Sequence, residues 1–213
     1  MKVFAPKNRL KTAAIPLRSI AAAWPGVGRT ETGVTMELVE NSPLDTGKIA
    51  SLISTKDDMF LVWPIAKWPF DHRQWAEVLD PGKGNVSFII REGGKSVGHA
   101  ALLNKGVPDT YTVSFLYLLP DYRSQGLGRC MVAALEDYAI RTFGAKMLRL
   151  VVRDYNPRAL KCYLHSGFKE TGWDGTLITM EKDRPGEIAG GQSAGAGDVL
   201  REDLQYNVDE RKE

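Results

Sequence analysis

Arg123-Ser124-Gln125-Gly126-Leu127-Gly128 is the stretch of sequence that decides the fold. It follows an apolar run over residues 112–119 and precedes a run with helical spacing over residues 129–143. A glycine-rich turn between a strand and a helix leaves several backbone N–H groups unpaired, with the positive end of the helix dipole behind them. The stretch therefore predicts a seat for an anionic phosphate group, with a plain turn as the alternative.

The patterns on either side of this turn predict a mixed α/β (α+β) domain. Upstream, we expect a helical N-terminal part followed by an antiparallel meander, and downstream a strand–helix–strand–helix–strand order. The predicted helices are residues 44–54, 72–79, 129–143 and 157–166, and the predicted strands are residues 86–91, 96–103, 110–119, 147–152 and 176–181.

Three segments of the chain differ in charge. Residues 1–35 hold six basic residues and one acidic residue, residues 36–184 are nearly neutral, and residues 185–213 hold three basic and seven acidic residues. We expect the first segment to be a disordered extension, either a transit peptide or the product of a start site placed too early, and the last to be a disordered Gly/Ala-rich acidic tail. Residues 36–184 are expected to form the folded domain, whose near-neutral charge argues against nucleic-acid binding.

The composition excludes several other classes of protein. A hydrophobic content of 43% fits a packed core, and no apolar run approaches the roughly 20 residues that span a bilayer. The two cysteines, Cys130 and Cys162, lie in helical patterns without a histidine or second cysteine at metal-ligand spacing. We interpret both as small core residues, and we expect no metal, no membrane contact and a reducing, cytoplasmic location.

Two motifs together resemble those of the GCN5-related N-acetyltransferase (GNAT) family. Residues 116–128 resemble its acetyl-coenzyme-A motif, in which Gln or Arg, two variable residues and Gly are followed by a variable residue and then Gly or Ala. Asn156, Ala159, Tyr163 and Gly167-Phe168 resemble its second motif. The resemblance covers about residues 36–183 and implies an acyl-CoA N-acyltransferase fold, with a mostly antiparallel sheet flanked by helices and with acetyl-CoA as co-substrate.

The resemblance also implies roles for single residues. The strand backbone at Leu116–Leu118 would run beside the pantetheine arm, and N–H groups from Ser124 to Arg129 would bind the pyrophosphate. The tyrosine of the second motif, Tyr163, would protonate the leaving thiolate as general acid. The implied cofactor-binding residues are Leu116, Tyr117, Leu118, Arg123, Ser124, Gln125, Gly126, Leu127, Gly128, Arg129 and Asn156.

Structural interpretations compete with these roles. Arg123 could add charge to the site, brace the loop, or be a solvated turn residue. Asn156 could bind the cofactor or cap the helix that starts at Pro157, and both can hold at once. Tyr163 could be a core aromatic on an amphipathic helix.

The sequence offers no obvious general base. Family members that acetylate ribosomal proteins place a glutamate five residues before the motif asparagine, where this chain has Val151. A water relay or a base from the N-terminal half would be needed, and the residues that could serve are His99, Tyr117, Asp71 and His72. Three of them have plainer explanations: His99 as an ordinary polar strand residue, Asp71 as a helix cap, and His72 as a residue on a solvated face.

The leading hypothesis is an N-acetyltransferase that acetylates a primary amine of a small molecule or peptide by direct attack in a ternary complex. The alternative is a non-catalytic acyl-CoA-binding module or regulator. A dense aromatic cluster could line the acceptor cleft or simply pack a helix onto the sheet; its members are Trp63, Trp68, Phe70 and Trp75. The family resemblance also makes a homodimer an expectation.

Overall fold

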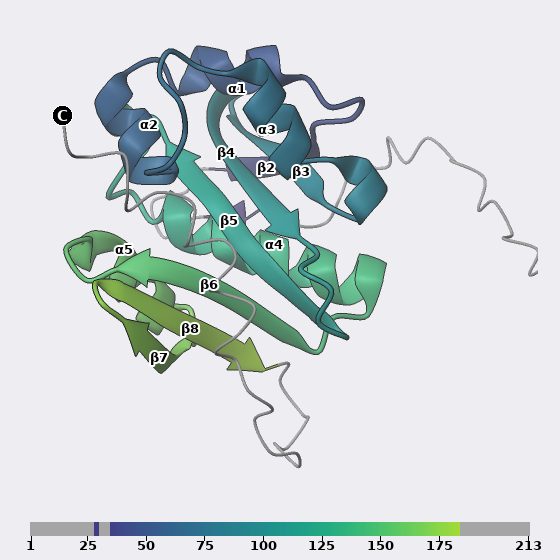
Figure 1. The fold of residues 1–213 in the computed structure, drawn as a ribbon, viewed down its shortest axis with the longest axis vertical. Coiled ribbons are helices and arrows are strands. Elements are labelled where there is room, and N and C mark those ends of the chain that lie inside the picture. Colours follow the sequence, from purple (N-terminus) through teal and green to yellow (C-terminus); the bar gives the residue numbers. More distant parts are fainter. Residues whose placement is uncertain (1–27, 30–34, 184–213) are drawn as a thin grey trace, which may run out of the picture.

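One sheet of eight strands, in the order β1-β2-β3-β4-β5-β6-β8-β7, organises the chain (Figure 1). The computed structural model describes residues 28–29 and 35–183. The strands are β1 (Gly28–Arg29), β2 (Thr35–Glu40), β3 (Val86–Glu92), β4 (Lys95–Leu103), β5 (Thr110–Leu118), β6 (Met147–Arg153), β7 (Lys169–Asp174) and β8 (Leu177–Asp183). The helices are α1 (Thr46–Leu52), α2 (Lys56–Val62), α3 (His72–Val78), α4 (Leu127–Phe143) and α5 (Pro157–His165), with 3-10 turns at Pro81–Lys83 and Pro120–Tyr122.

Among the strands in residues 28–29 and 35–183, one neighbouring pair runs parallel. β5 and β6 pair in parallel and are joined through the crossover helix α4, whereas every other neighbouring pair is antiparallel. This mixed, mostly antiparallel sheet confirms the fold class predicted from the sequence. A parallel pair requires a long connection, and α4 supplies it directly after the glycine-rich turn.

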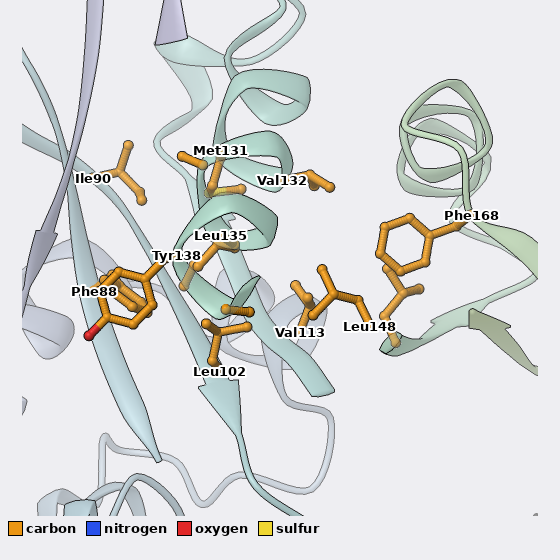
Figure 2. Packing of buried hydrophobic residues seen from close by; sticks show 14 of the residues in the cluster. Phe88, Ile90, Leu102, Val113, Met131, Val132, Leu135, Tyr138, Leu148 and Phe168 are labelled. Atoms are coloured by element: carbon orange, nitrogen blue, oxygen red, sulfur yellow. The ribbon is translucent and has the colours of Figure 1, made fainter. Parts of the chain in front are cut away.

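Hydrophobic cores lie on both faces of the sheet. On one face α4 packs against β3, β4, β5 and β6 through residues such as Met131, Leu135 and Tyr138 (Figure 2). On the other face α1, α2 and α3 cover β3, β4 and β5, and Trp75 is the largest fully buried side chain of that cluster. The strands at the centre of the sheet are therefore fixed from both sides, which holds the C-terminal part of β5 in place.

Several boundaries differ from the sequence predictions. The N-terminal part is not only helical, because β2 pairs antiparallel with β3. The structure also adds α2 and the edge strand β7, neither of which was predicted. Within the predicted N-terminal extension, Gly28–Arg29 pair with β2 as β1. The rest of the predicted extension and the acidic tail from residue 184 lie outside the described residues.

Candidate functional site

A cavity of about 540 Å³ opens where β5 and β6 separate. The two strands pair only at Thr110–Thr112 with Met147–Arg149, although both continue further in the same direction. The remainder of β5 therefore presents backbone groups that β6 does not use. Leu116, Tyr117 and Leu118 lie in this stretch and line the cavity. An extended ligand that carries amide groups can pair with such a strand edge.

The second wall of the cavity is the glycine-rich loop. Ser124 and Gly126 adopt left-handed backbone conformations, with φ of 63° and 81°. Gly126 is the N-cap of α4 and provides no side-chain cap for the first turn of this 17-residue helix. The Arg129 N–H donates to the Gly126 carbonyl oxygen at 3.1 Å, which leaves the N–H groups of Leu127 and Gly128 for an anion. The helix dipole favours negative charge there. Ser124, Gly126, Gly128 and Arg129 all line the cavity.

Arg123 braces this loop against two other elements. Its Nε donates to the Leu118 carbonyl oxygen at 2.8 Å, and its Nη2 donates to the Asp58 carboxylate of α2 at 2.9 Å. The guanidinium also lies 5.3 Å from the centre of the Tyr117 ring. Arg123 lines the cavity, but its Nε and Nη2 groups already donate to acceptors within the protein. The carboxylate that it meets lies on the helix preceding the Trp63–Phe70 segment, so the brace ties that helix to the loop.

Asp58 is a shared acceptor at this position. Burial tends to raise the pKa of Asp58, but hydrogen bonds from Arg123, Thr55 and Tyr117 outweigh it and lower the pKa below its usual value. Burial and the neighbouring Asp58 charge raise the pKa of the Tyr117 phenol to about 12. The Tyr117 hydroxyl therefore stays protonated at neutral pH and donates to Asp58, and both groups are poor bases.

The third wall is α5, which begins at the predicted cap. Asn156 Oδ1 accepts from the Ala159 N–H at 3.2 Å, so the capping interpretation is correct, and Asn156 also lines the cavity. Tyr163 lies farther along α5 and also lines the cavity, with its ring 6.1 Å from the ring of Phe168. Burial raises the pKa of the Tyr163 phenol, which therefore keeps its proton.

The structure gathers most, but not all, of the predicted residues. Leu127 is fully buried in the core, and the Gln125 side chain donates to the Asp121 carbonyl oxygen; neither lines the cavity. The predicted residues that do line it are Leu116, Tyr117, Leu118, Arg123, Ser124, Gly126, Gly128, Arg129, Asn156 and Tyr163.

Sequence reasoning missed a basic face of α5. Arg158, Lys161 and His165 line the cavity and follow one another at spacings of three and four residues, which puts them on one side of a helix. That spacing was a readable signal. Leu61 of α2 also lines the cavity, but nothing local in the sequence indicates its place there.

Of the four side chains considered as general base, only Tyr117 lines the cavity. Asp71 caps α3 by accepting from the N–H groups of Arg73 and Gln74. His72 contacts Thr46 Oγ1 at 2.9 Å on the surface. His99 is fully buried, and burial lowers its pKa to about 4.

The aromatic cluster is largely a packing feature. Trp63 and Phe70 contact the buried Trp75 with ring centres 5.2 and 5.3 Å apart. These three rings join α3 and the preceding loop to the sheet. Trp68 is the exception, since 42% of its surface is exposed.

Comparison with known proteins matches this arrangement of loop, strand edge and helix. The family model described as Acetyltransferase (GNAT) family matches residues 52–168, more than half of the chain. The chain belongs to the GNAT family. It is accordingly an acetyl-CoA-dependent N-acetyltransferase, and acetyl-CoA is its co-substrate.

Three GNAT proteins illustrate the degree of similarity, which is low in sequence for each of them. The thialysine N-epsilon-acetyltransferase of Bos taurus is 24% identical over 148 residues, which are 67% of this chain and 83% of that protein. The spermidine N-acetyltransferase of Vibrio cholerae, solved with CoA and spermine, has a TM-score of 0.56 at 16% identity and covers 70% of this chain and 95% of that one. PseH of Campylobacter jejuni, solved with acetyl coenzyme A, has a TM-score of 0.53 at 19% identity, with 70% and 99% covered. At these identities the solved structures establish the fold alone.

The described residues also bear on the predictions about membrane spans, cysteines and metal ligands. No helix in residues 35–183 combines the length and apolarity needed to cross a membrane. Cys130 and Cys162 are free thiols and partly buried, and Cys162 lines the cavity. No cluster of three metal-ligating side chains occurs in that part of the chain. The homodimer stays a prediction.

Proposed function

We propose that this GNAT enzyme acetylates the primary amine of a small molecule or peptide by direct attack on acetyl-CoA in a ternary complex. The observation that carries the proposal is the cavity where a free strand edge, an uncapped helix N-terminus and the Tyr163 phenol meet. The backbone of Leu116–Leu118 would hold the pantetheine arm, and N–H groups between Ser124 and Gly128 would bind the pyrophosphate, with the Arg129 side chain beside them. Arg158 and Lys161 would add positive charge near the phosphates.

In the proposed reaction, Tyr163 provides a proton to the leaving thiolate and water removes a proton from the substrate ammonium. The amine nitrogen attacks the thioester carbonyl carbon, and a backbone N–H near Tyr117 or Leu118 stabilises the oxyanion. The C–S bond then breaks, and Tyr163 gives its proton to the departing thiolate. The nitrogen loses its second proton as the amide forms, and that proton restores the Tyr163 phenol. The base that removes the ammonium proton is a water relay, because the phenol of Tyr117 is committed to Asp58.

Direct transfer is supported against an acyl-cysteine intermediate. Cys162 is the cysteine that lines the cavity, and burial raises its pKa. A thiol that stays protonated is a poor nucleophile. Initial rates measured against both substrates should therefore give intersecting rather than parallel double-reciprocal lines, and Cys162→Ser should remain active.

The residues that line the cavity favour an acceptor substrate with a single amine attached to an apolar group. Near α2 its wall is formed by Leu61, Leu116 and Tyr117, and none of the described lining residues is an aspartate or glutamate. The nearby carboxylate of Asp58 already pairs with Arg123. Among the described residues that line the cavity, a polyamine would find no carboxylate for its additional charges, whereas an apolar body can be buried against Leu61.

We expect an arylalkyl monoamine such as tryptamine to be acetylated with a kcat/KM about tenfold above that of spermidine, since burying an aromatic group contributes about 1.5–3 kcal/mol. CoA thiol release in a panel of amines measures this. Leu61→Gln should reduce the preference, whereas Phe60→Gln, its exposed neighbour that does not line the cavity, should not. A preference for spermidine would reject the acceptor class, and binding of CoA without thiol release for any amine would reject the proposed activity.

A brace role for Arg123 predicts that Asp58→Ala weakens CoA binding about as much as Arg123→Ala does. Breaking one partner of a partly buried hydrogen-bonded pair costs about 1–3 kcal/mol, which corresponds to roughly tenfold in affinity if the loop loses its position. The double variant should be no weaker than either single one, because both remove the same interaction. Calorimetric titration with CoA measures these affinities. If Arg123 instead binds phosphate directly, Asp58→Ala will leave CoA affinity unchanged or raise it.

A further inference from the structure

The strand that lines the cavity contains an irregularity at Phe115. His99 pairs with Tyr117 but Ala101 pairs with Ser114, so Phe115 and Leu116 together face Ala100. This is a β-bulge, with one additional residue in β5. Phe115 has a φ of 54°, a left-handed conformation that a bulky side chain rarely adopts. The bulge directly precedes Tyr117 and Leu118, and it redirects the strand edge that faces the cavity.

Ring packing and a side-chain hydrogen bond both hold Phe115. Its ring lies 5.1 Å from the rings of both Trp63 and Trp75, which hold the side chain. Its carbonyl oxygen is held by a hydrogen bond from a side chain of the neighbouring strand: His99 Nδ1 lies 3.2 Å away. A strained residue persists only where its surroundings determine it from several directions, and the buried imidazole is one of them.

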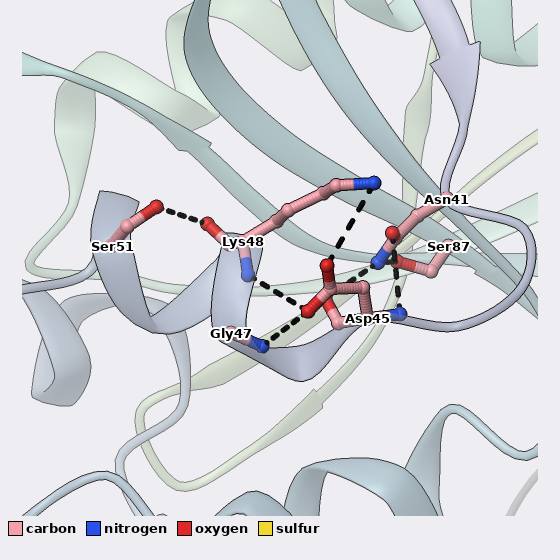
Figure 3. Close-up of polar contacts among 6 residues, drawn as sticks. All are labelled: Asn41, Asp45, Gly47, Lys48, Ser51 and Ser87. Carbon is pink, nitrogen blue, oxygen red and sulfur yellow. Dashed lines mark hydrogen bonds and ion pairs between the residues drawn. The ribbon is translucent and has the colours of Figure 1, made fainter.

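The proton positions of His99 follow from its partners. A carbonyl oxygen can only accept, so Nδ1 carries the proton. Burial lowers the pKa of His99 to about 4, and the neutral ring then leaves Nε2 as an acceptor. Ser87 Oγ, 3.0 Å from Nε2, must donate to it. Asn41 Nδ2 in turn donates to Ser87 Oγ at 3.3 Å, where the chain enters α1 (Figure 3).

We propose that His99 is a positioning residue for acetyl transfer: its Nδ1–H holds the Phe115 carbonyl and so fixes the bulge that aims the Tyr117 and Leu118 backbone into the cavity. The inference rests on the proposed function, because it assumes that this strand edge holds the thioester. His99 itself does not line the cavity and touches no substrate. The Phe115 carbonyl oxygen by itself requires the proton on Nδ1, whereas Ser87 only satisfies Nε2 on the other side of the ring.

Substituting His99 by asparagine or by glutamine distinguishes the role of the Nδ1 hydrogen bond from that of the Nε2 hydrogen bond. The asparagine amide nitrogen occupies the place of Nδ1, so His99→Asn can still donate to Phe115. The glutamine amide nitrogen reaches the place of Nε2, so His99→Gln faces Ser87 and loses that donor. Ser87→Ala is the matched control, because it removes the other partner of the ring and leaves the Nδ1 hydrogen bond.

We expect His99→Gln to lower kcat by at least about tenfold, since a misplaced reacting group costs up to roughly 100-fold. The Kd for CoA should change less than threefold in His99→Gln because the glycine-rich loop is intact, and His99→Asn and Ser87→Ala should keep kcat within threefold. Equal losses in both His99 variants, or activity that follows melting temperature across all three, would overturn the proposal.

A measurement on the unaltered protein keeps the proposal testable if His99→Gln fails to fold. The ¹⁵N chemical shifts of the His99 ring at pH 7 should be those of a neutral imidazole protonated at Nδ1. Protonation at Nε2 would overturn the proposal. This readout does not depend on turnover, so failure of the acetyltransferase activity with every amine is distinguishable from failure of the His99 assignment.

Discussion

Tyr163→Phe is expected to lower kcat by about 100-fold or more, the usual contribution of a positioned proton donor. The phenol lines the cavity on α5, and burial raises its pKa, so it carries a proton when the thiolate departs. Phenylalanine retains the ring that contacts Phe168. The substitution therefore removes the proton and little of the packing. The measurement is thiol release at saturating acetyl-CoA and amine.

Tyr138→Phe is the matched control for that substitution. Tyr138 is a buried tyrosine on α4, and its hydroxyl donates to Glu40 at 2.7 Å without lining the cavity. Its loss should lower the melting temperature and leave kcat unchanged. In Tyr163→Phe we expect the Kd for CoA to change less than threefold, because the backbone contacts remain. A kcat within twofold of the unaltered enzyme would exclude Tyr163 as general acid.

The elements that carry the two motifs could be predicted because their signals are local. Gly126, with its positive φ, and the asparagine–proline pair at Asn156-Pro157 mark helix starts by backbone chemistry that depends on few neighbours. The helix α4 begins at Leu127, two residues before its predicted start, since a helix continues as far as its cap allows. The apolar strand β5 was equally readable from its run of hydrophobic residues.

The unpredicted elements had weak or misread signals. Thr55 caps α2 by accepting from the Asp58 N–H at 3.1 Å, and this Thr-x-x-Asp spacing before an apolar run is a helix-start signature that could have been used. The edge strand β7 is mostly exposed and polar, so it carries no hydrophobic period. Its place depends on pairing with β8, which no local pattern encodes.

The fine geometry of the site could not be predicted from sequence because it depends on distant contacts. Arg123 and Asp58 are 65 positions apart, and the sequence left the role of Arg123 open between charge, brace and solvated turn. The bulge at Phe115 similarly depends on the neighbouring strand and on two tryptophans from another part of the chain. Motifs fix which residues face a ligand, whereas tertiary contacts decide how they are held.

Gly98→Ala is expected to damage the cofactor site more than any other glycine substitution in the described strands. Gly98 pairs with Leu118 across β4 and β5, and a Cβ there would lie 2.3 Å from the Tyr117 carbonyl oxygen and 2.8 Å from Leu118 Cδ2. Atoms cannot approach that closely, so β5 must move away from β4 at the residues that line the cavity.

We expect Gly98→Ala to destabilise the fold by about 1–3 kcal/mol, the usual cost of overpacking, and to weaken CoA binding at least tenfold even where the protein remains folded. Gly172→Ala is the matched control, because its Cβ would meet Thr179 Cβ at an ordinary 3.8 Å in the edge strand β7. Thermal unfolding and calorimetric titration with CoA measure the two effects. If Gly98→Ala binds CoA as tightly as Gly172→Ala does, the β5 backbone at Tyr117 and Leu118 is not part of the cofactor site, because a displacement at that point would have to disturb it.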